Sequence, residues 1–192
     1  MRRTPKQHPV TRIALGLILG AMPLAVPGLH AATQSDAVAS DATSALDAGH
    51  GTGDEWLDTR LADIDAYQAR YPAAFASELE RYAAIPRDYL RGLLAQPGWA
   101  AGDAWFACFL ARAIDATCRS VVRARARAGT LAPWSQVLED IDAGPRELAQ
   151  VRLALADSYR RWARPLQPDA ALARALRARE SHAQAADAQP AR

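Results

Sequence analysis

Hydrophobic residues recur at helical spacing from residue 54 onward. Four of them in 54–70 are separated by steps of 4, 3 and 3 residues: Leu57, Leu61, Ile64 and Tyr67. Five in 145–164 follow steps of 3, 4, 4 and 3 residues: Leu148, Val151, Leu155, Tyr159 and Trp162. Such steps place the side chains on one face of a helix. The pattern therefore predicts an amphipathic helix at each end of a helical domain, the first one capped by Asp54.

Prolines and glycines divide the chain between these two helices into shorter ones. We expect five helices here: one opened by Pro72, one over 87–96, one capped by Asp103, one over 118–128 and one opened by Pro133. The helix capped by Asp103 is apolar over more than half of its circumference, which indicates a central helix covered on several sides. No stretch alternates apolar and polar residues between hairpin turns. We therefore expect an all-α, compact single-domain bundle of six or seven short helices.

Small and polar residues flank the predicted helical domain, which covers 54–168. Residues 32–53 are rich in Ala, Ser, Thr, Asp and Gly. Because they offer little apolar surface to bury, they are interpreted as a flexible linker, and this linker contains His50. Residues 169–192 contain few large apolar side chains and are predicted to form a surface helix over 169–180 followed by a disordered tail over 181–192.

The first 31 residues have the layout of a secretory signal peptide. Four cations without an acid among them stand at the start: Arg2, Arg3, Lys6 and Arg12. The apolar run that follows, over 13–26, is shorter than the roughly 20 residues that cross a bilayer. We expect cleavage, a periplasmic or secreted protein, and no transmembrane span after cleavage; an uncleaved anchor is the alternative. No cysteine lies near the cut, so a lipoprotein is not expected.

The net charge of the chain changes sign once this segment is removed. The whole chain carries a net charge of +2, but 1–31 hold four cations and no acid, so the remaining chain has a net charge of −2. A chain of that charge does not favour nucleic-acid binding. Arginine outnumbers lysine 22 to 1, which is more typical of a GC-rich genome than of recognition by arginine.

The chain contains two cysteines, Cys108 and Cys118. An exported chain with two cysteines favours one structural disulfide. If the central helix ends near 114, three extended residues would let Cys118 return beside Cys108. Two buried thiols and a redox pair are the alternatives, and the spacing is not that of a Cys-x-x-Cys redox motif.

Histidine is absent from residues 54–180. This weighs against histidine-dependent nucleophilic catalysis and against histidine-ligated zinc, and two cysteines are too few for a four-cysteine site. No glycine-rich phosphate loop of a known spacing is present. We assign no catalytic residue, metal or cofactor. A lysozyme-like hydrolase or lyase acting on the cell wall is the alternative, and it would need a glutamate as general acid. The candidates are Glu78, Glu80, Glu139 and Glu147.

Three arginines at steps of four residues, Arg119, Arg123 and Arg127, form one face of the helix predicted over 118–128. One interpretation is a basic ridge that binds an anionic partner. The other is a solvated face that pairs with the acidic first helix.

Several short motifs resemble a group of small exported proteobacterial proteins of uncharacterised function. They are Ile85-Pro86-Arg87-Asp88-Tyr89-Leu90, Gly98-Trp99 with Gly102-Asp103, Ala107-Cys108, Thr117-Cys118-Arg119 with Val121-Val122, and Trp134 with Val137-Leu138. The resemblance covers about residues 70 to 165, supports the pairing of the two cysteines, and implies no activity. The sequence as a whole predicts an exported, non-catalytic module that binds an envelope or secreted protein or another anionic surface.

Overall fold

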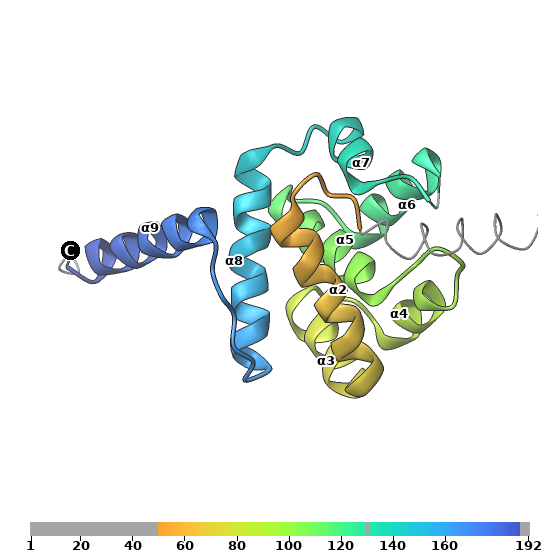
Figure 1. Ribbon diagram of the computed structural model, residues 1–192, viewed down its shortest axis with the longest axis horizontal. Helices are drawn as coiled ribbons and strands as arrows, with labels where there is room; N and C mark the ends of the chain where they lie inside the picture. The colour runs from red at the N-terminus through yellow and green to blue at the C-terminus, as the bar shows by residue number, and fades with distance from the viewer. Residues whose placement is uncertain (1–49, 130, 189–192) are drawn as a thin grey trace, which may run out of the picture. The chain divides into compact units, whose positions relative to one another are not determined.

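The computed structural model describes residues 50–129 and 131–188, and these form eight α-helices and no strand (Figure 1). The helices are α2 (Glu55–Arg70), α3 (Pro72–Tyr82), α4 (Arg87–Leu94), α5 (Ala101–Ala113), α6 (Cys118–Ala128), α7 (Trp134–Asp140), α8 (Pro145–Arg161) and α9 (Ala170–Asp187). The all-α prediction is confirmed, with eight helices in place of six or seven. The predicted signal peptide and the linker up to residue 49 lie outside the described residues.

Side-chain caps begin α2 and α6, and the cap of α2 is the predicted one. Asp54 accepts a hydrogen bond from the Leu57 amide at 3.0 Å, and Thr117 accepts one from the Ser120 amide at 3.2 Å. Asp103 is not the cap that was expected: α5 begins at Ala101. Asp103 is the third residue of α5, and its carboxylate accepts a hydrogen bond from the Ala100 amide at 3.1 Å. An acid at this position can reach back to the residue before the helix, which satisfies one orphan amide of the first turn.

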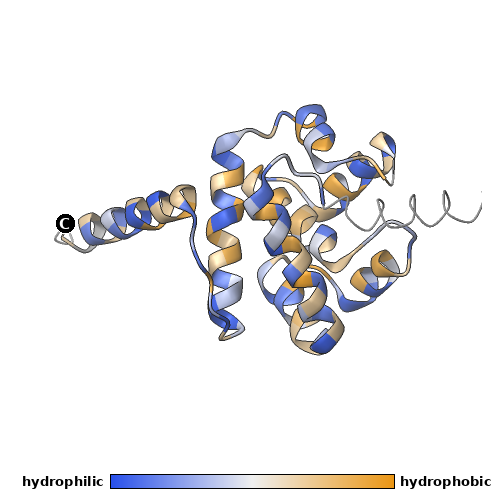
Figure 2. Ribbon diagram, viewed as in Figure 1, coloured by the Kyte–Doolittle hydropathy of each residue, from blue (hydrophilic) through white to orange (hydrophobic). Residues whose placement is uncertain are grey.

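Helix α5 lies at the centre of the helical domain. Every residue from Ala101 to Ala111 is buried. The helix packs against α2, α4, α6 and α8, which confirms the prediction of a central helix. Figure 2 shows the complementary pattern on α8, where hydrophobic and hydrophilic residues alternate along the helix in bands. That banding is expected for a helix with one face on the core and the other in water.

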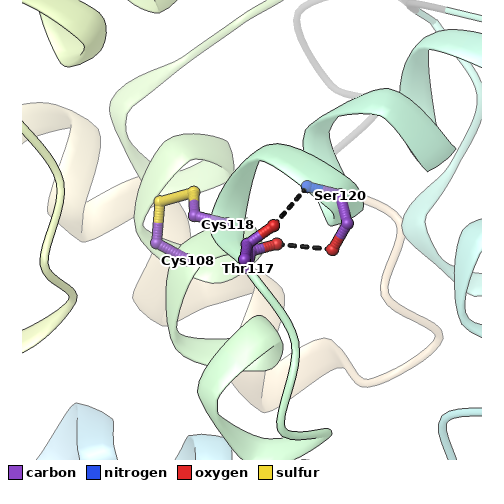
Figure 3. Close-up of a disulfide and its surroundings, with 4 residues drawn as sticks. All are labelled: Cys108, Thr117, Cys118 and Ser120. Carbon is purple, nitrogen blue, oxygen red and sulfur yellow. Dashed lines mark hydrogen bonds between the residues drawn. A yellow bond between two sulfur atoms is a disulfide. The ribbon is translucent and has the colours of Figure 1, made fainter.

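The disulfide between Cys108 and Cys118 joins α5 to the start of α6, as predicted (Figure 3). The chain reverses between them because Asp115 adopts a left-handed backbone conformation with φ of 54°. The Ala116 amide then donates to the Ala111 carbonyl at 2.7 Å, which closes the end of α5. This brings the two cysteine Cα atoms to 4.3 Å from each other.

The two C-terminal helices differ in length from the prediction: α8 is shorter than the helix expected over 145–164, and α9 is longer than expected. Helix α8 ends at Arg161, and Trp162 follows it as the capping residue. Helix α9 packs against α8 and runs to Asp187, although a tail was expected from residue 181. Asp169 caps it by accepting a hydrogen bond from the Leu172 amide at 2.7 Å. Within the described residues, no helix combines the length and apolar character needed to cross a membrane.

Candidate functional site

The three arginines of the predicted ridge all lie on the exposed face of α6. Arg119, Arg123 and Arg127 are exposed, and none of them forms an ion pair with another described residue. We call these three residues the α6 arginine face. It does not pair with the acidic first helix.

The acids of α2 and its cap have other partners. Asp54 binds Arg152, Asp63 binds Arg164 and the Tyr159 hydroxyl, and Asp65 binds His50. Arginines of α8 and of the segment after it therefore supply much of the counter-charge that the sequence interpretation had assigned to α6. The α6 arginine face remains available to a partner from outside the described residues.

A hollow of about 330 Å³ lies beside the disulfide at the start of this face. Both cysteines line it, together with Tyr89 and with Arg112 and Arg119. The guanidinium carbon of Arg119 lies 5.1 Å from the centre of the Tyr89 ring, within the range of a cation–π contact. Arg112, like Arg119, is exposed. The disulfide thus fixes one wall of a hollow in which two cations and an aromatic ring meet.

A buried ionic cluster around His50 is the feature that the sequence argument missed. The Nδ1 atom of His50 lies 2.8 Å from an Asp103 oxygen, and its Nε2 atom lies 3.1 Å from an Asp65 oxygen. The His50 side chain is only 7% exposed. The sequence placed this residue in a flexible linker, but residues 50–53 pack on the domain. The amide of Ser135 donates to the Gly51 carbonyl at 2.8 Å and helps to hold them there.

Glycine at position 102 makes room for the imidazole. A Cβ atom added to Gly102 would lie 2.5 Å from the Leu61 carbonyl oxygen and 2.8 Å from His50 Cε1. The Gly102 amide also donates to Asp65 at 2.6 Å. The backbone of α5 therefore approaches α2 and His50 as closely as a residue without a side chain allows.

Asp103 is the centre of this cluster and binds two further side chains besides His50. It accepts a hydrogen bond from the Trp134 indole at 2.7 Å, and it forms an ion pair with Arg125 at 2.9 Å. The Arg125 guanidinium carbon lies 4.8 Å from the Trp99 ring centre and 4.7 Å from that of Trp134. Arg125 is therefore a buried structural arginine, although it lies on the same helix as the exposed α6 arginine face.

These contacts shift the pKa values of both partners. Burial by itself would lower the pKa of His50, but the hydrogen bonds and charges of Asp103 and Asp65 outweigh it and raise the pKa from 6.5 to about 9. Burial would raise the pKa of Asp103, but His50, Arg125 and the Trp134 indole lower it from 3.8 to about 2. At neutral pH the cluster holds a histidinium and an aspartate. Both ring nitrogens of His50 are used, so it cannot act as a general base without leaving the cluster.

The glutamates that a lysozyme-like enzyme would need already have structural partners, or lie open to solvent. Buried Glu78 accepts hydrogen bonds from the Ser158 hydroxyl at 2.6 Å and from Arg161 Nε at 3.0 Å. Glu147 accepts a hydrogen bond from the Gly144 amide at 2.9 Å, and exposed Glu80 forms an ion pair with Arg87 at 2.7 Å. Glu139 is exposed on α7. A general acid has to carry a proton into a cleft, whereas Glu78 lies against a cation and acts as an acceptor.

Metal binding and similarity to known proteins give no further guide to a site. Among the residues that the structure describes, no group of three or more His, Cys, Asp or Glu side chains is arranged to hold a metal ion. Comparison with protein-family models, with curated proteins and with solved structures finds no match to this chain.

Proposed function

We propose that this protein is an exported, non-catalytic binding module that captures an anionic envelope-associated partner on the α6 arginine face. The observation that carries the proposal is the position of these three arginines. They are exposed at successive turns of one helix and have no carboxylate partner among the described residues. Cations on the rim of an interface accelerate association with an anionic partner and add specificity more than affinity.

The rigidity of this face supports the same proposal. The disulfide ties the first turn of α6 to the central helix α5. Arg125 ties its last turn to the buried Asp103. A helix that is held at both ends presents its outer arginines in a fixed geometry, which reduces the entropy that binding has to overcome. The contacts of Glu78, Glu80 and Glu147 favour binding over cell-wall hydrolysis.

The experiment is affinity capture from an envelope fraction with the purified protein and two charge-reversal variants. Arg123→Glu/Arg127→Glu reverses the α6 arginine face, and Arg174→Glu/Arg177→Glu makes the same change in net charge on exposed positions of α9. We expect the partner to bind the wild type and the α9 variant, and the α6 variant to bind at least about tenfold more weakly.

Capture should also weaken between about 50 and about 300 mM NaCl, because exposed charges are screened by salt. Equal loss of binding in both variants would mean that net charge alone matters. Undiminished binding by the α6 variant would refute the proposal. Far-UV circular dichroism of all three proteins checks that the helices are intact.

A further inference from the structure

The hollow beside the disulfide is the first of four hollows that adjoin one another. It shares Arg112 with a hollow of about 320 Å³ between α5 and α8. That hollow shares Tyr82 and Arg161 with a third one of about 440 Å³, and the third shares Tyr67 and Trp162 with a fourth of about 510 Å³. Because each hollow shares lining residues with the next, the four follow one another along the surface. We call this series of hollows the arginine–tyrosine track.

Charge along this track is strongly positive. Six arginines and two carboxylates line the four hollows. The arginines are Arg70, Arg81, Arg112, Arg119, Arg161 and Arg164. Both carboxylates already bind cations: Glu78 binds Arg161, and Asp157 binds Arg160 and Arg179.

Four of the six arginines on the track are free cations. The first four of those arginines are exposed and form no ion pair with a described residue. Each hollow contains at least one of these four. The track therefore offers unpaired positive charge in every hollow.

A tyrosine accompanies the free arginine in each hollow. Tyr89 lines the first hollow, Tyr82 the second and third, and Tyr71 the fourth. Tyr71 is 50% exposed and Tyr82 is 40% exposed. None of these three hydroxyl groups forms a hydrogen bond with another described residue, in contrast to the buried hydroxyl of Tyr159, which binds Asp63. Four unpaired guanidinium groups and three phenol hydroxyls are thus distributed along the track, and each hollow is lined by at least one of each.

We infer that the arginine–tyrosine track binds a linear acidic polysaccharide, with about one uronic-acid unit in each hollow. The track meets the α6 arginine face at Arg119, and this inference rests on the proposed function, since it names the chemistry of the anionic partner. A repeated site favours a repeated ligand, and a uronic acid carries a carboxylate for the guanidinium and hydroxyls for the phenol on one ring. Each hollow lies at the lower end of the roughly 300–1,000 Å³ range of small-ligand pockets, which suits one or two sugar rings better than a folded protein.

Acidic peptides and single-stranded nucleic acids match the track less well. A peptide that docks on a protein commonly uses a strand edge or a continuous apolar groove. The described residues form no strand, and at least one arginine lines each of the four hollows. Bases need free ring faces for stacking. One face of Tyr82 is covered by the Arg161 guanidinium at 3.7 Å, and one face of Trp162 is covered by Tyr67 at 4.4 Å.

Titration calorimetry with four defined polymers tests this inference. The probes are polygalacturonate oligomers, neutral dextran, poly-glutamate and single-stranded poly-dT. We expect the purified protein to bind polygalacturonate with an affinity that falls as salt rises, to bind dextran undetectably, and to bind the other two polyanions at least about tenfold more weakly. Equal affinity for poly-glutamate or poly-dT would overturn the assignment to a polysaccharide.

Two variants distinguish the track from a general attraction between charges. Arg70→Glu/Arg81→Glu should weaken polygalacturonate binding at least about tenfold, while Arg174→Glu/Arg177→Glu on α9 should leave it unchanged. Equal effects of the two variants would refute the assignment of polygalacturonate binding to the track.

The tyrosine hydroxyls have a test of their own. Tyr71→Phe/Tyr82→Phe keeps the rings and the charge and should weaken polygalacturonate binding about threefold to tenfold, the effect of losing hydrogen bonds of about 1 kcal/mol. An unchanged affinity would show that the protein recognises only the charge of the polymer and would refute the role of the tyrosine hydroxyls. If polygalacturonate does not bind but the α6 variant still loses an envelope partner, the proposed function stands and this inference fails. If no anionic partner binds in either experiment, both fail.

Discussion

Replacing His50 by glutamine should remove a pH-dependent part of the stability. The His50 pKa is raised from 6.5 to about 9, and one pKa unit corresponds to about 1.4 kcal/mol, so protonation of His50 adds about 3 kcal/mol to the free energy of unfolding. The folded state binds this proton more tightly than the unfolded state. The contribution is therefore fully present below pH 6.5 and is lost as the pH rises through 9.

Urea unfolding followed by circular dichroism, at steps of pH between about 5 and 10, measures this contribution. The wild type should be about 3 kcal/mol more stable at pH 6 than above pH 9.5, with a slope approaching about 1.4 kcal/mol per pH unit between the two pKa values. The His50→Gln variant should lack this slope, because glutamine cannot be protonated in this range. The difference between the two curves cancels the contribution of every group that titrates alike in both proteins.

Parallel curves for the two proteins would refute the reasoning, since they would mean that the folded and unfolded states hold the His50 proton equally. The acid side provides an independent check. The Asp103 pKa is lowered from 3.8 to about 2. The stabilisation by ionised Asp103 is therefore present above pH 3.8 and is lost as the pH falls through 2. In His50→Gln this loss should be smaller, because one of the partners that lower the Asp103 pKa has been removed.

Three further changes should separate structural contacts from surface positions. Reduction of the disulfide should lower the free energy of unfolding by about 2.5–3 kcal/mol, as expected for closing a loop of about ten residues, and a thiol assay before reduction should find no free thiol. Gly102→Ala should destabilise by about 1–3 kcal/mol because its Cβ would collide with the Leu61 carbonyl, whereas Gly92→Ala, which meets nothing within 4 Å, should be neutral or stabilising in urea unfolding. Arg125→Met should lower the melting temperature by several degrees by leaving buried Asp103 with one cation fewer, whereas Arg123→Met should leave it unchanged.

Local signals account for the parts of the fold that the sequence predicted. The bounds of α2 follow from the cap at Asp54 and the four apolar residues of one face, all within 16 residues. The disulfide follows from two cysteines and the reach of a short turn. In each case the interacting groups are close together in the chain, so spacing alone limits the possible arrangements.

The cluster around His50 could not be predicted in this way, because its parts are distant in sequence. Asp103 lies 53 residues from His50, and Asp65 lies 15 residues from it. The residues next to His50 are small and polar, and such residues are typical of a linker. Only the packing of α2 against α5 brings the two carboxylates together, and that packing depends on the missing side chain of Gly102. A histidine beside glycines carries no local sign of this.

The burial of Arg125, in contrast, could have been predicted from the spacing of residues in the sequence, although the sequence analysis did not use it. Cys118, Val121 and Arg125 follow steps of 3 and 4 residues and are all buried. An arginine in phase with the apolar residues of a helix must find a buried acid or leave its charge unpaired at a high free-energy cost. Asp103, the only acid of α5, was the matching acid. The same phase rule places Arg119 and Arg123 on the opposite, exposed face. Applying it to every helix before counting charges separates arginines that hold the fold together from those that remain free for a partner.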